Sequence, residues 1–312
     1  MSKHVFFVHG RNFKPDLAIL QKEWLSSVEH GLQREFGAEL LGQFHDVKKT
    51  FIYYGDISNR FLASKGKSYD KAADIRDRQE ARKQLMSYAS SDFDDRSVYE
   101  NLPGKSALKE ALADVFGRAL FFTGISDNLI SAVAPDMAHY WNQDHQFGSD
   151  IRWRLTEPLA DAMAAGDEIL MVCHSLGSIV AFDVLWKFSH YGEYQFLREK
   201  KIQTWITLGS PLGDATVIRN LKGRGAKGQR RFPDNICRWH NVAAEDDFIA
   251  YDQTVENDYR LMISEGLIRS ILDHRIYNLS VRGGKSNPHF VTGYLMSPVV
   301  AGLIGNWLND DA

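Results

Sequence analysis

The sequence predicts an α/β fold: a mostly parallel sheet of about six strands, with helices on both faces and a helical insertion. Two observations lead to this class. Short apolar runs, rich in β-branched and aromatic residues, are typical of buried strands. Segments with helical periodicity alternate with these runs, as in βαβ units, whose strands are parallel. The predicted strands span residues 5–8, 50–54, 169–173, 205–208, 236–242 and 275–281.

The helices are predicted from apolar residues that recur every three or four positions. In the first helix, residues 17–36, Leu17, Leu20 and Trp24 show this spacing. The segment 71–83 is densely charged, and we expect it to be solvated. The later predicted helices span residues 107–122, 125–140, 151–165, 178–188 and 299–308.

We expect one domain over residues 1–312, because α/β folds routinely exceed the average domain length. Residues 56–140 form a predicted helical insertion within it. The apolar side chains of this insertion make it a lid candidate, although apolar helix faces more often cover a sheet. These side chains include Phe116, Phe121, Phe122 and Ile125.

The composition is that of a globular protein, since 44% of the 312 residues are apolar and 25% are charged. A net charge of −3 offers no general attraction to nucleic acid. Only two cysteines, Cys173 and Cys237, favour a reducing compartment. The N-terminal apolar run is too short for a signal peptide, and no stretch reaches the ~18 apolar residues of a spanning helix. We therefore expect a soluble, cytoplasmic protein without a transmembrane segment.

The most informative segment is residues 169–183, where an apolar run turns through Cys-His-Ser-Leu-Gly into a helix. This is one residue away from the G-x-S-x-G nucleophile elbow, and it lies in the strand–turn–helix context that this motif needs. The residues two before and two after the serine must be small, because the strand and helix backbones approach closely there. Gly177 meets this requirement, and Cys173 is small without being glycine. The segment therefore predicts Ser175 as a nucleophile.

The backbone amides near Ser175 predict an oxyanion hole. One N–H donor is expected from the residue after the nucleophile, Leu176. The other is expected from the loop after the first strand, which ends at His9-Gly10, and we assign it to Arg11. We expect His9 to order this loop rather than to act as a base.

The acid and the base should follow the nucleophile in the chain in that order. The loop after the predicted strand 236–242 offers Asp247, which precedes an apolar pair that can anchor the loop, with Asp246 as the alternative. The base should follow the last strand. His289 does so, whereas His274 lies before the predicted strand 275–281, at the wrong end of a parallel sheet.

These segments together resemble a known family. The motifs are F-F-V-H-G, C-H-S-L-G-S-I-V-A, L-G-S-P-L, W-H-N-V-A-A-E-D-D-F-I-A and N-P-H-x-x-x-G-Y-L. They are similar to those of α/β hydrolases, and more narrowly to bacterial lipase/esterase-like relatives of the lipid-remodelling inositol deacylases. The resemblance covers most of the chain but is weak from Asp56 to about Met137. It implies Ser175, Asp247 and His289 as a catalytic triad.

The resemblance also implies that residues 207–212 line the pocket beside the triad. We expect Gly10, Ser210 and Pro211 to contact the substrate, with Ser210 acting through the shape of the backbone rather than as a nucleophile.

The expected function is serine-dependent hydrolysis of a carboxylic ester, as in an esterase or lipase, through an acyl-enzyme. The alternatives are the same fold acting on an amide or thioester, an acyltransferase, or a non-catalytic binding protein. No cofactor and no metal is expected, because no metal-binding motif such as H-E-x-x-H occurs.

The expected partner is a small-molecule or lipid ester, and peripheral contact with a membrane is compatible with this substrate. No nucleic acid partner is expected, and the sequence indicates no oligomeric state. The loop 222–231 carries five cations. It is either a solvated surface loop or, because it follows a strand end that we expect near the site, a contact for an anionic substrate or headgroup.

Overall fold

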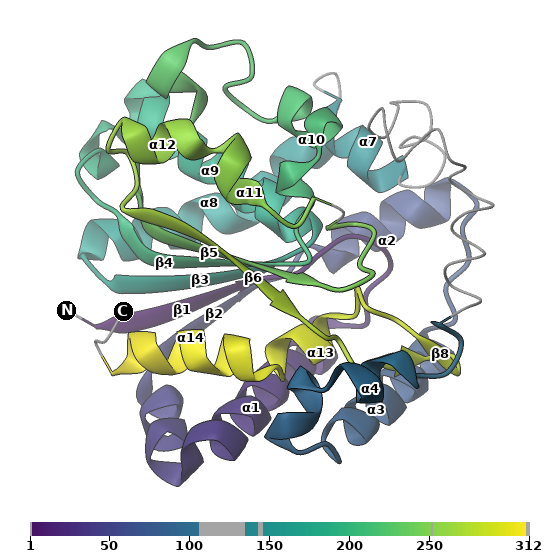
Figure 1. The fold of residues 1–312 in the computed structure, drawn as a ribbon. Coiled ribbons are helices and arrows are strands. Elements are labelled where there is room, and N and C mark those ends of the chain that lie inside the picture. The colour runs from purple at the N-terminus through teal and green to yellow at the C-terminus, as the bar shows by residue number, and fades with distance from the viewer. Residues whose placement is uncertain (1, 106–134, 143–145, 251, 310–312) are drawn as a thin grey trace.

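Six parallel strands form one sheet in the computed structural model of the chain, in the order β2-β1-β3-β4-β5-β6 (Figure 1). The structure describes residues 2–105, 135–142, 146–250 and 252–309. The strands are β1 (Lys3–Val8), β2 (Lys48–Ile52), β3 (Glu168–His174), β4 (Ile202–Leu208), β5 (Ile236–Ala244) and β6 (Ser270–Ile276). The predicted α/β class and parallel sheet are confirmed.

The strand order places a topological switch between β1 and β3. From β1 the chain moves to β2 on one side, and then returns to β3 on the other side of β1. Connections on either side of this point leave a crevice beyond the carboxyl ends of the strands, which is where open α/β sheets bind ligands. The residues that follow β1 and β3 are therefore in the position where a site is expected.

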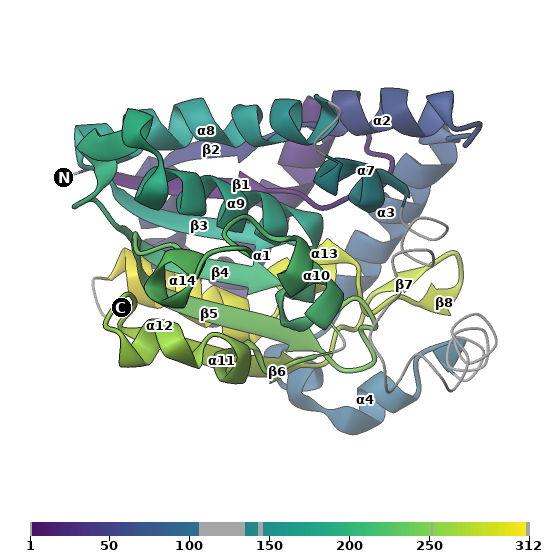
Figure 2. The same cartoon turned by 90° about the horizontal axis from the view of Figure 1, so that it is seen from above.

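Helices cover both faces of the sheet. In Figures 1 and 2, α8, α9, α11 and α12 lie over one face, and α1, α13 and α14 lie over the other. The longer helices are α1 (Leu17–Asp46), α2 (Gly55–Ser64), α3 (Lys71–Leu85), α8 (Phe147–Ala165), α9 (Leu176–His190) and α14 (Pro298–Leu308). The shorter ones are α4 (Arg96–Glu100), α7 (Pro135–Trp141), α10 (Ala215–Asn220), α11 (Val255–Asp258), α12 (Arg260–Ser264) and α13 (Val291–Leu295).

Four 3₁₀ turns and a small hairpin complete the described structure. The turns are η1 (Ser90–Asp94), η2 (Gly192–Leu197), η3 (Pro211–Gly213) and η4 (Gly228–Arg231). The hairpin consists of β7 (Val281–Arg282) and β8 (Lys285–Ser286), which pair antiparallel.

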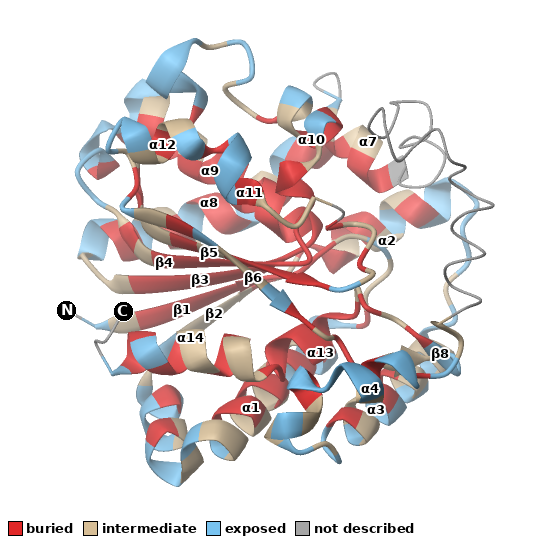
Figure 3. Cartoon of the chain, viewed as in Figure 1, coloured by how far each residue is buried: buried red, intermediate tan, exposed pale blue. Residues whose placement is uncertain are grey.

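The apolar runs of the inner strands form because both of their faces are buried (Figure 3). Successive side chains of β1 alternate between two cores. Phe6 and Val8 pack under α8 and α9, whereas Val5 and Phe7 pack against α1 and α14. All four are fully buried.

The last strand differs from its prediction. Residues 275–281 were expected to form it, but β6 is Ser270–Ile276, so His274 lies within the strand rather than before it. The reason is that β6 is the edge of the sheet, and its inner residues are polar and only partly buried. The second strand is also two residues earlier than the predicted 50–54.

The predicted helices 17–36, 151–165, 178–188 and 299–308 are present, with changed ends. The first helix continues past residue 36 to Asp46, with a break at Gly37, whose φ is +78°. The charged segment 71–83 was expected to be solvated, and this is wrong in part. In α3, Arg78, Ala81 and Leu85 are buried, because the helix packs against α13 and β7.

The lid candidates fall outside the described residues. The predicted helix 107–122 and most of 125–140, with Phe116, Phe121, Phe122 and Ile125, belong to this part of the chain. The end of the second helix is described, as α7. In the described ranges, every helix is too short or too polar to cross a bilayer.

Candidate active site

Three polar side chains meet at the carboxyl end of the sheet. Ser175 directly follows β3, Asp247 follows β5, and His289 follows the β7–β8 hairpin. The Oγ of Ser175 lies 3.0 Å from Nε2 of His289. On the other side of the ring, Nδ1 lies 2.9 and 3.0 Å from the two carboxylate oxygens of Asp247. The structure thus brings together the serine, histidine and aspartate that the sequence predicts.

The two adjacent aspartates have different partners. Asp247 is 2% exposed and binds His289. Asp246 adopts a φ of +59°, and its carboxylate accepts a hydrogen bond from the hydroxyl of Tyr99 at 3.0 Å. The turn at Asp246 therefore directs its side chain toward α4 while Asp247 faces the histidine. Of the two, Asp247 is the carboxylate in contact with His289.

Ser175 has a strained backbone. Its φ of +54° and ψ of −125° lie in a region that residues other than glycine rarely adopt. The backbone N–H of Ser175 still bonds to β4, at the carbonyl of Leu208 (3.0 Å). Helix α9 begins at the next residue. This sharp turn presents the hydroxyl at the end of the sheet, as in a nucleophile elbow.

Two glycines permit the turn. A Cβ added to Gly177 would lie 2.5 Å from the carbonyl oxygen of Val8, so a side chain at this position would collide with β1. A Cβ added to Gly10 would lie 2.8 Å from the Cβ of Ser175. Gly10 therefore lies directly against the serine, where the sequence predicts a substrate contact.

Cys173 occupies the other tight position of the motif. Its thiol points into the core and accepts a hydrogen bond from the indole N–H of Trp205 at 3.3 Å. Burial raises the pKa of this thiol well above its usual range. The side chain lies on the same face of the sheet as that of Val8, within the core that α8 and α9 cover.

The loop after β1 is held in place by a buried carboxylate from α7. Asp136 is fully buried, and its Oδ1 accepts from Nε and Nη2 of Arg11 at 3.0 and 2.8 Å. Its Oδ2 accepts from the backbone N–H of Asn12 at 3.0 Å. The ammonium of Lys14 donates to the backbone carbonyl of Arg11. These contacts fix the backbone on which the predicted Arg11 amide lies.

The second predicted amide belongs to Leu176, the first residue of α9. An N–H in the first turn of a helix has no carbonyl partner within that helix, so it is available to an acceptor outside it. The positive end of the helix dipole adds to this preference for an anion.

Both ring nitrogens of His9 form hydrogen bonds with nearby backbone groups. Nε2 accepts from the backbone N–H of Tyr54 at 3.1 Å, and Nδ1 donates to the carbonyl of Gly10 at 2.7 Å. Burial, and the charge of Lys14 to a smaller extent, lower the pKa of His9 well below its usual range. The ring thus orders the loop as a neutral group.

His174 binds the backbone of His289. Its Nε2 lies 3.0 Å from the backbone carbonyl oxygen of His289. Burial, followed by the neighbouring charge of His289, lowers the pKa of His174 well below its usual range. The ring therefore remains neutral, with its proton on Nε2.

Tyr294 of α13 supports the carboxylate. Its hydroxyl lies 2.6 Å from Oδ2 of Asp247 and accepts from the backbone N–H of Ala244 at 2.9 Å. Asp136, His174 and Tyr294 were not among the predicted site residues. The signals for two of them were local, since His174 precedes the serine directly and Tyr294 lies five residues after His289.

Ser210 and Pro211 follow β4 and are buried. The Oγ of Ser210 accepts from the backbone N–H of Leu212 at 3.3 Å and begins the turn η3. Ser210 thus shapes the backbone of this loop.

The basic loop 222–231 has two interpretations, a solvated surface loop or a contact for an anionic substrate near the site, and the part around Arg230 lies away from Ser175. Nε1 of Trp186, in the second half of α9, donates to the carbonyl of Arg230 at 2.9 Å. Trp186 lies about 16 Å from Ser175 along the helix axis, at 1.5 Å per residue. The loop runs back along α9, away from the carboxyl ends of the strands.

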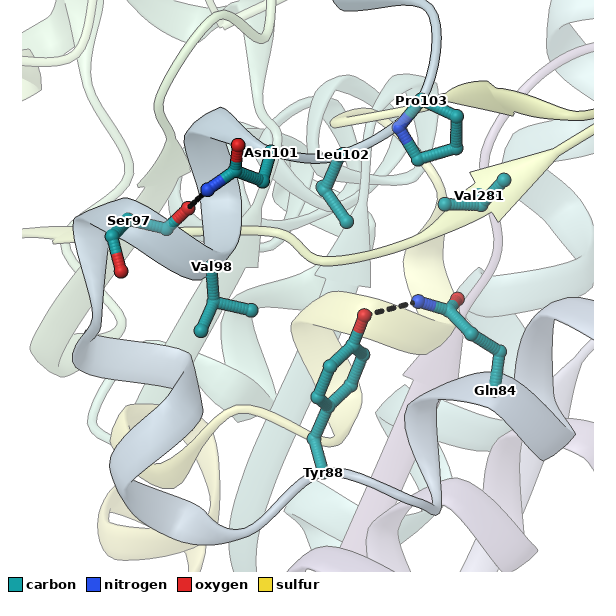
Figure 4. A pocket seen from close by; sticks show the side chains of 8 residues that line it. All are labelled: Gln84, Tyr88, Ser97, Val98, Asn101, Leu102, Pro103 and Val281. Carbon is teal, nitrogen blue, oxygen red and sulfur yellow. Dashed lines mark hydrogen bonds between the residues drawn. The ribbon is translucent and has the colours of Figure 1, made fainter.

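A separate pocket of about 540 Å³ lies between α3, α4 and β7 (Figure 4). Its lining is mostly apolar and includes Tyr88, Val98, Leu102 and Val281. The hydrogen bond from Gln84 to the hydroxyl of Tyr88, 2.8 Å long, closes one side. Ser175, Asp247 and His289 are not part of this lining.

No group of three or more histidine, cysteine, aspartate or glutamate side chains in the described residues is arranged to bind a metal ion. No family model, curated protein or solved structure matches the chain.

Proposed function

We propose that the chain is a serine hydrolase of the α/β-hydrolase kind that cleaves a carboxylic ester through an acyl-enzyme. One observation carries the proposal: Ser175, His289 and Asp247 form a continuous chain of hydrogen bonds at the carboxyl ends of the parallel strands. A nucleophile, a base and an acid that orients the base are the parts that acyl transfer to serine requires.

In the proposed reaction, the Oγ of Ser175 attacks the ester carbonyl carbon while Nε2 of His289 takes the hydroxyl proton. The tetrahedral intermediate collapses, the bond to the alkoxy oxygen breaks, and His289 returns the proton to the leaving alcohol. A water molecule, activated by the same ring, then hydrolyses the acyl-enzyme. Asp247 holds Nδ1 in the protonated form and stabilises the cation that develops on the ring.

The oxyanion would be bound by the backbone amides of Leu176 and Arg11. Fixed amides are effective because they need no reorganisation as the charge develops, and removal of one donor from such a site costs about 10²–10³ in kcat. The buried Asp136 supports this role, since it binds both the side chain of Arg11 and the next backbone amide.

The ester is favoured as the substrate because the sequence motifs resemble those of lipase- and esterase-like hydrolases. An amide, a thioester or transfer to another acceptor would use the same three residues. Hydrolysis rates on matched ester, amide and thioester substrates distinguish these possibilities.

Labelling with a fluorophosphonate probe tests the proposal. The wild-type protein should react at Ser175, and Ser175→Ala should lose labelling and about 10⁴–10⁶-fold of ester turnover. Ser178→Ala is the matched control, because Ser178 is a buried serine in the first turn of α9, three residues after Ser175, and its hydroxyl has no partner among the described residues. A folded wild-type protein that is not labelled would instead indicate a binding protein with an idle site.

A further inference from the structure

The carboxylate of Asp247 is fully buried and surrounded by donors from three directions. His289 binds both oxygens, the backbone N–H of Ile249 binds Oδ1 at 3.0 Å, and the hydroxyl of Tyr294 binds Oδ2 at 2.6 Å. The bond from Tyr294 is the shortest of these. A buried charge without water depends on such donors for its stabilisation.

We infer that Tyr294 is a positioning residue, which holds Asp247 toward His289 and sets the strength with which the carboxylate stabilises a proton on that ring. The inference rests on the proposed function, because it concerns the pH range in which His289 acts as a base. Three features of the site support it.

The first is the direction of the hydrogen bond. The hydroxyl of Tyr294 accepts from the backbone N–H of Ala244, so its own proton is free to point at Asp247. Burial, and then the charge of Asp247, raise the pKa of Tyr294 well above its usual range. The phenol therefore remains a donor throughout the range in which the site would work.

The second feature is the close approach of Gly209 to the contact between Tyr294 and Asp247. Gly209, at the end of β4, has a φ of +53°. A Cβ at this position would lie 2.8 Å from Oδ2 of Asp247 and 3.2 Å from the hydroxyl oxygen of Tyr294. The end of β4 thus lies directly against the tyrosine–aspartate contact, and a side chain there would disturb it.

The third is the place of Tyr294 in the chain. Tyr294 lies on α13, the helix that begins two residues after His289. One short segment therefore carries both the ring and the hydroxyl that bind Asp247. Both lie within hydrogen-bond distance of Oδ2, so together they fix the position of this oxygen.

Other titratable and charged groups lie near the site on several elements. The ring of His174 packs against that of His289. Tyr99 and Lys105 contact Asp246, and Tyr99 also binds the carbonyl of Glu245. Arg78 and Arg282 lie over the ring of Phe290, the residue after His289. Tyr294 differs from Tyr99 in touching Asp247 itself, since Tyr99 binds Asp246 and the carbonyl of Glu245.

The expected sign follows from the chemistry of the donor. A hydroxyl that donates to a carboxylate draws off part of its charge. Without this donor, Asp247 stabilises the protonated ring of His289 more strongly, so a higher pH is needed to obtain the neutral base. Tyr294→Phe should move the acidic limb of the kcat/KM profile upward by about half a unit to one unit, which lowers kcat/KM on that limb about three- to tenfold.

The matched control is Tyr99→Phe, which removes a tyrosine hydroxyl from the neighbouring aspartate of the same loop. Its acidic limb should coincide with that of the wild type. A further variant keeps the ring and changes only the donor: 3,5-difluorotyrosine at position 294 is a stronger donor and should move the acidic limb downward. A role in packing alone predicts no opposite shift for the fluorinated residue.

A measurement without substrate separates this inference from the proposed function. In histidine-labelled protein, the NMR titration midpoint of the His289 ring, assigned with His289→Gln, should move upward in Tyr294→Phe and not in Tyr99→Phe. Coincident midpoints and coincident acidic limbs in a folded Tyr294→Phe protein would overturn the inference. An upward NMR shift in a protein that lacks esterase activity would overturn the proposed function instead.

Discussion

Nε2 of His174 lies 3.0 Å from the backbone carbonyl oxygen of His289, and the centres of the two rings are 4.6 Å apart. The residue before Ser175 thus binds the backbone of His289, the base of the proposed reaction. Ser175 and His289 are therefore linked in two ways. Their side chains form one hydrogen bond, and His174, the neighbour of Ser175, forms a second with the backbone of His289. This contact should fix the ring of His289 relative to the turn at the end of β3.

His174→Ala is expected to lower kcat about tenfold with little change in KM, because it removes the hydrogen bond that positions the base. His174→Gln, whose amide can donate to the same carbonyl, should recover part of this loss. His190→Ala is the control, since Nε2 of His190 binds the carbonyl of Phe232 at 2.8 Å away from the site. Equal effects of the alanine variants on kcat would contradict the positioning role. Steady-state kinetics and melting temperatures distinguish the outcomes.

Asp247→Asn should lower kcat by about 10²–10⁴-fold, because an asparagine can neither hold Nδ1 of His289 in the protonated form nor stabilise the ring cation. Asp246→Asn should lower it less than about threefold, because its carboxylate faces Tyr99. The two variants remove the same charge from adjacent positions, so the comparison isolates the contact with His289. The reverse order of effects would assign the acid to Asp246.

Gly177→Ala should destabilise the fold by about 1–3 kcal/mol, because its Cβ would meet the backbone of Val8. Gly42→Ala is the comparison. Gly42 lies on the exposed side of α1 with no atom within 4 Å of an added Cβ, so alanine should stabilise the helix by about 0.5–1 kcal/mol. Chemical denaturation measures both changes. A neutral Gly177→Ala would mean that β1 and α9 are not held as close together as the structure has them.

Arg78→Met should cost about 3–5 kcal/mol, because it leaves Glu23 buried without its cation. Both residues are less than one-tenth exposed, and Nη1 of Arg78 lies 3.1 Å from the nearer oxygen of Glu23. The double variant Glu23→Gln, Arg78→Met should recover much of this loss. Arg96→Met, which breaks the exposed pair with Glu100, should leave the melting temperature unchanged.

The sequence was sufficient for the interior strands and for the turn at Ser175. Strands β1 and β3 are covered on both faces, so they appear as unbroken apolar runs. Edge strand β6 was displaced in the prediction because Asp273, His274 and Arg275 interrupt it, and an edge can carry such residues in a partly exposed position.

The partners of the site were harder to predict. The choice between Asp246 and Asp247 depends on a single positive φ, which no local pattern reveals. Asp136 and Arg11 are 125 residues apart in the chain, and Tyr294 and Asp247 are 47 apart. Contacts of this kind result from the packing of α7 and α13 against the ends of the strands, so they become visible only in the folded chain.

Under the proposed function, the strained backbone of Ser175 lowers the thermal stability of the protein at the residue that its reaction requires. A serine held at a φ of +54° stores about 1–3 kcal/mol of strain, which glycine would release and alanine would not. Ser175→Gly should therefore melt at a higher temperature than Ser175→Ala, although both lack the hydroxyl. Selection of variants for heat resistance alone would favour replacement of this serine by glycine, so any such screen needs a simultaneous requirement for turnover.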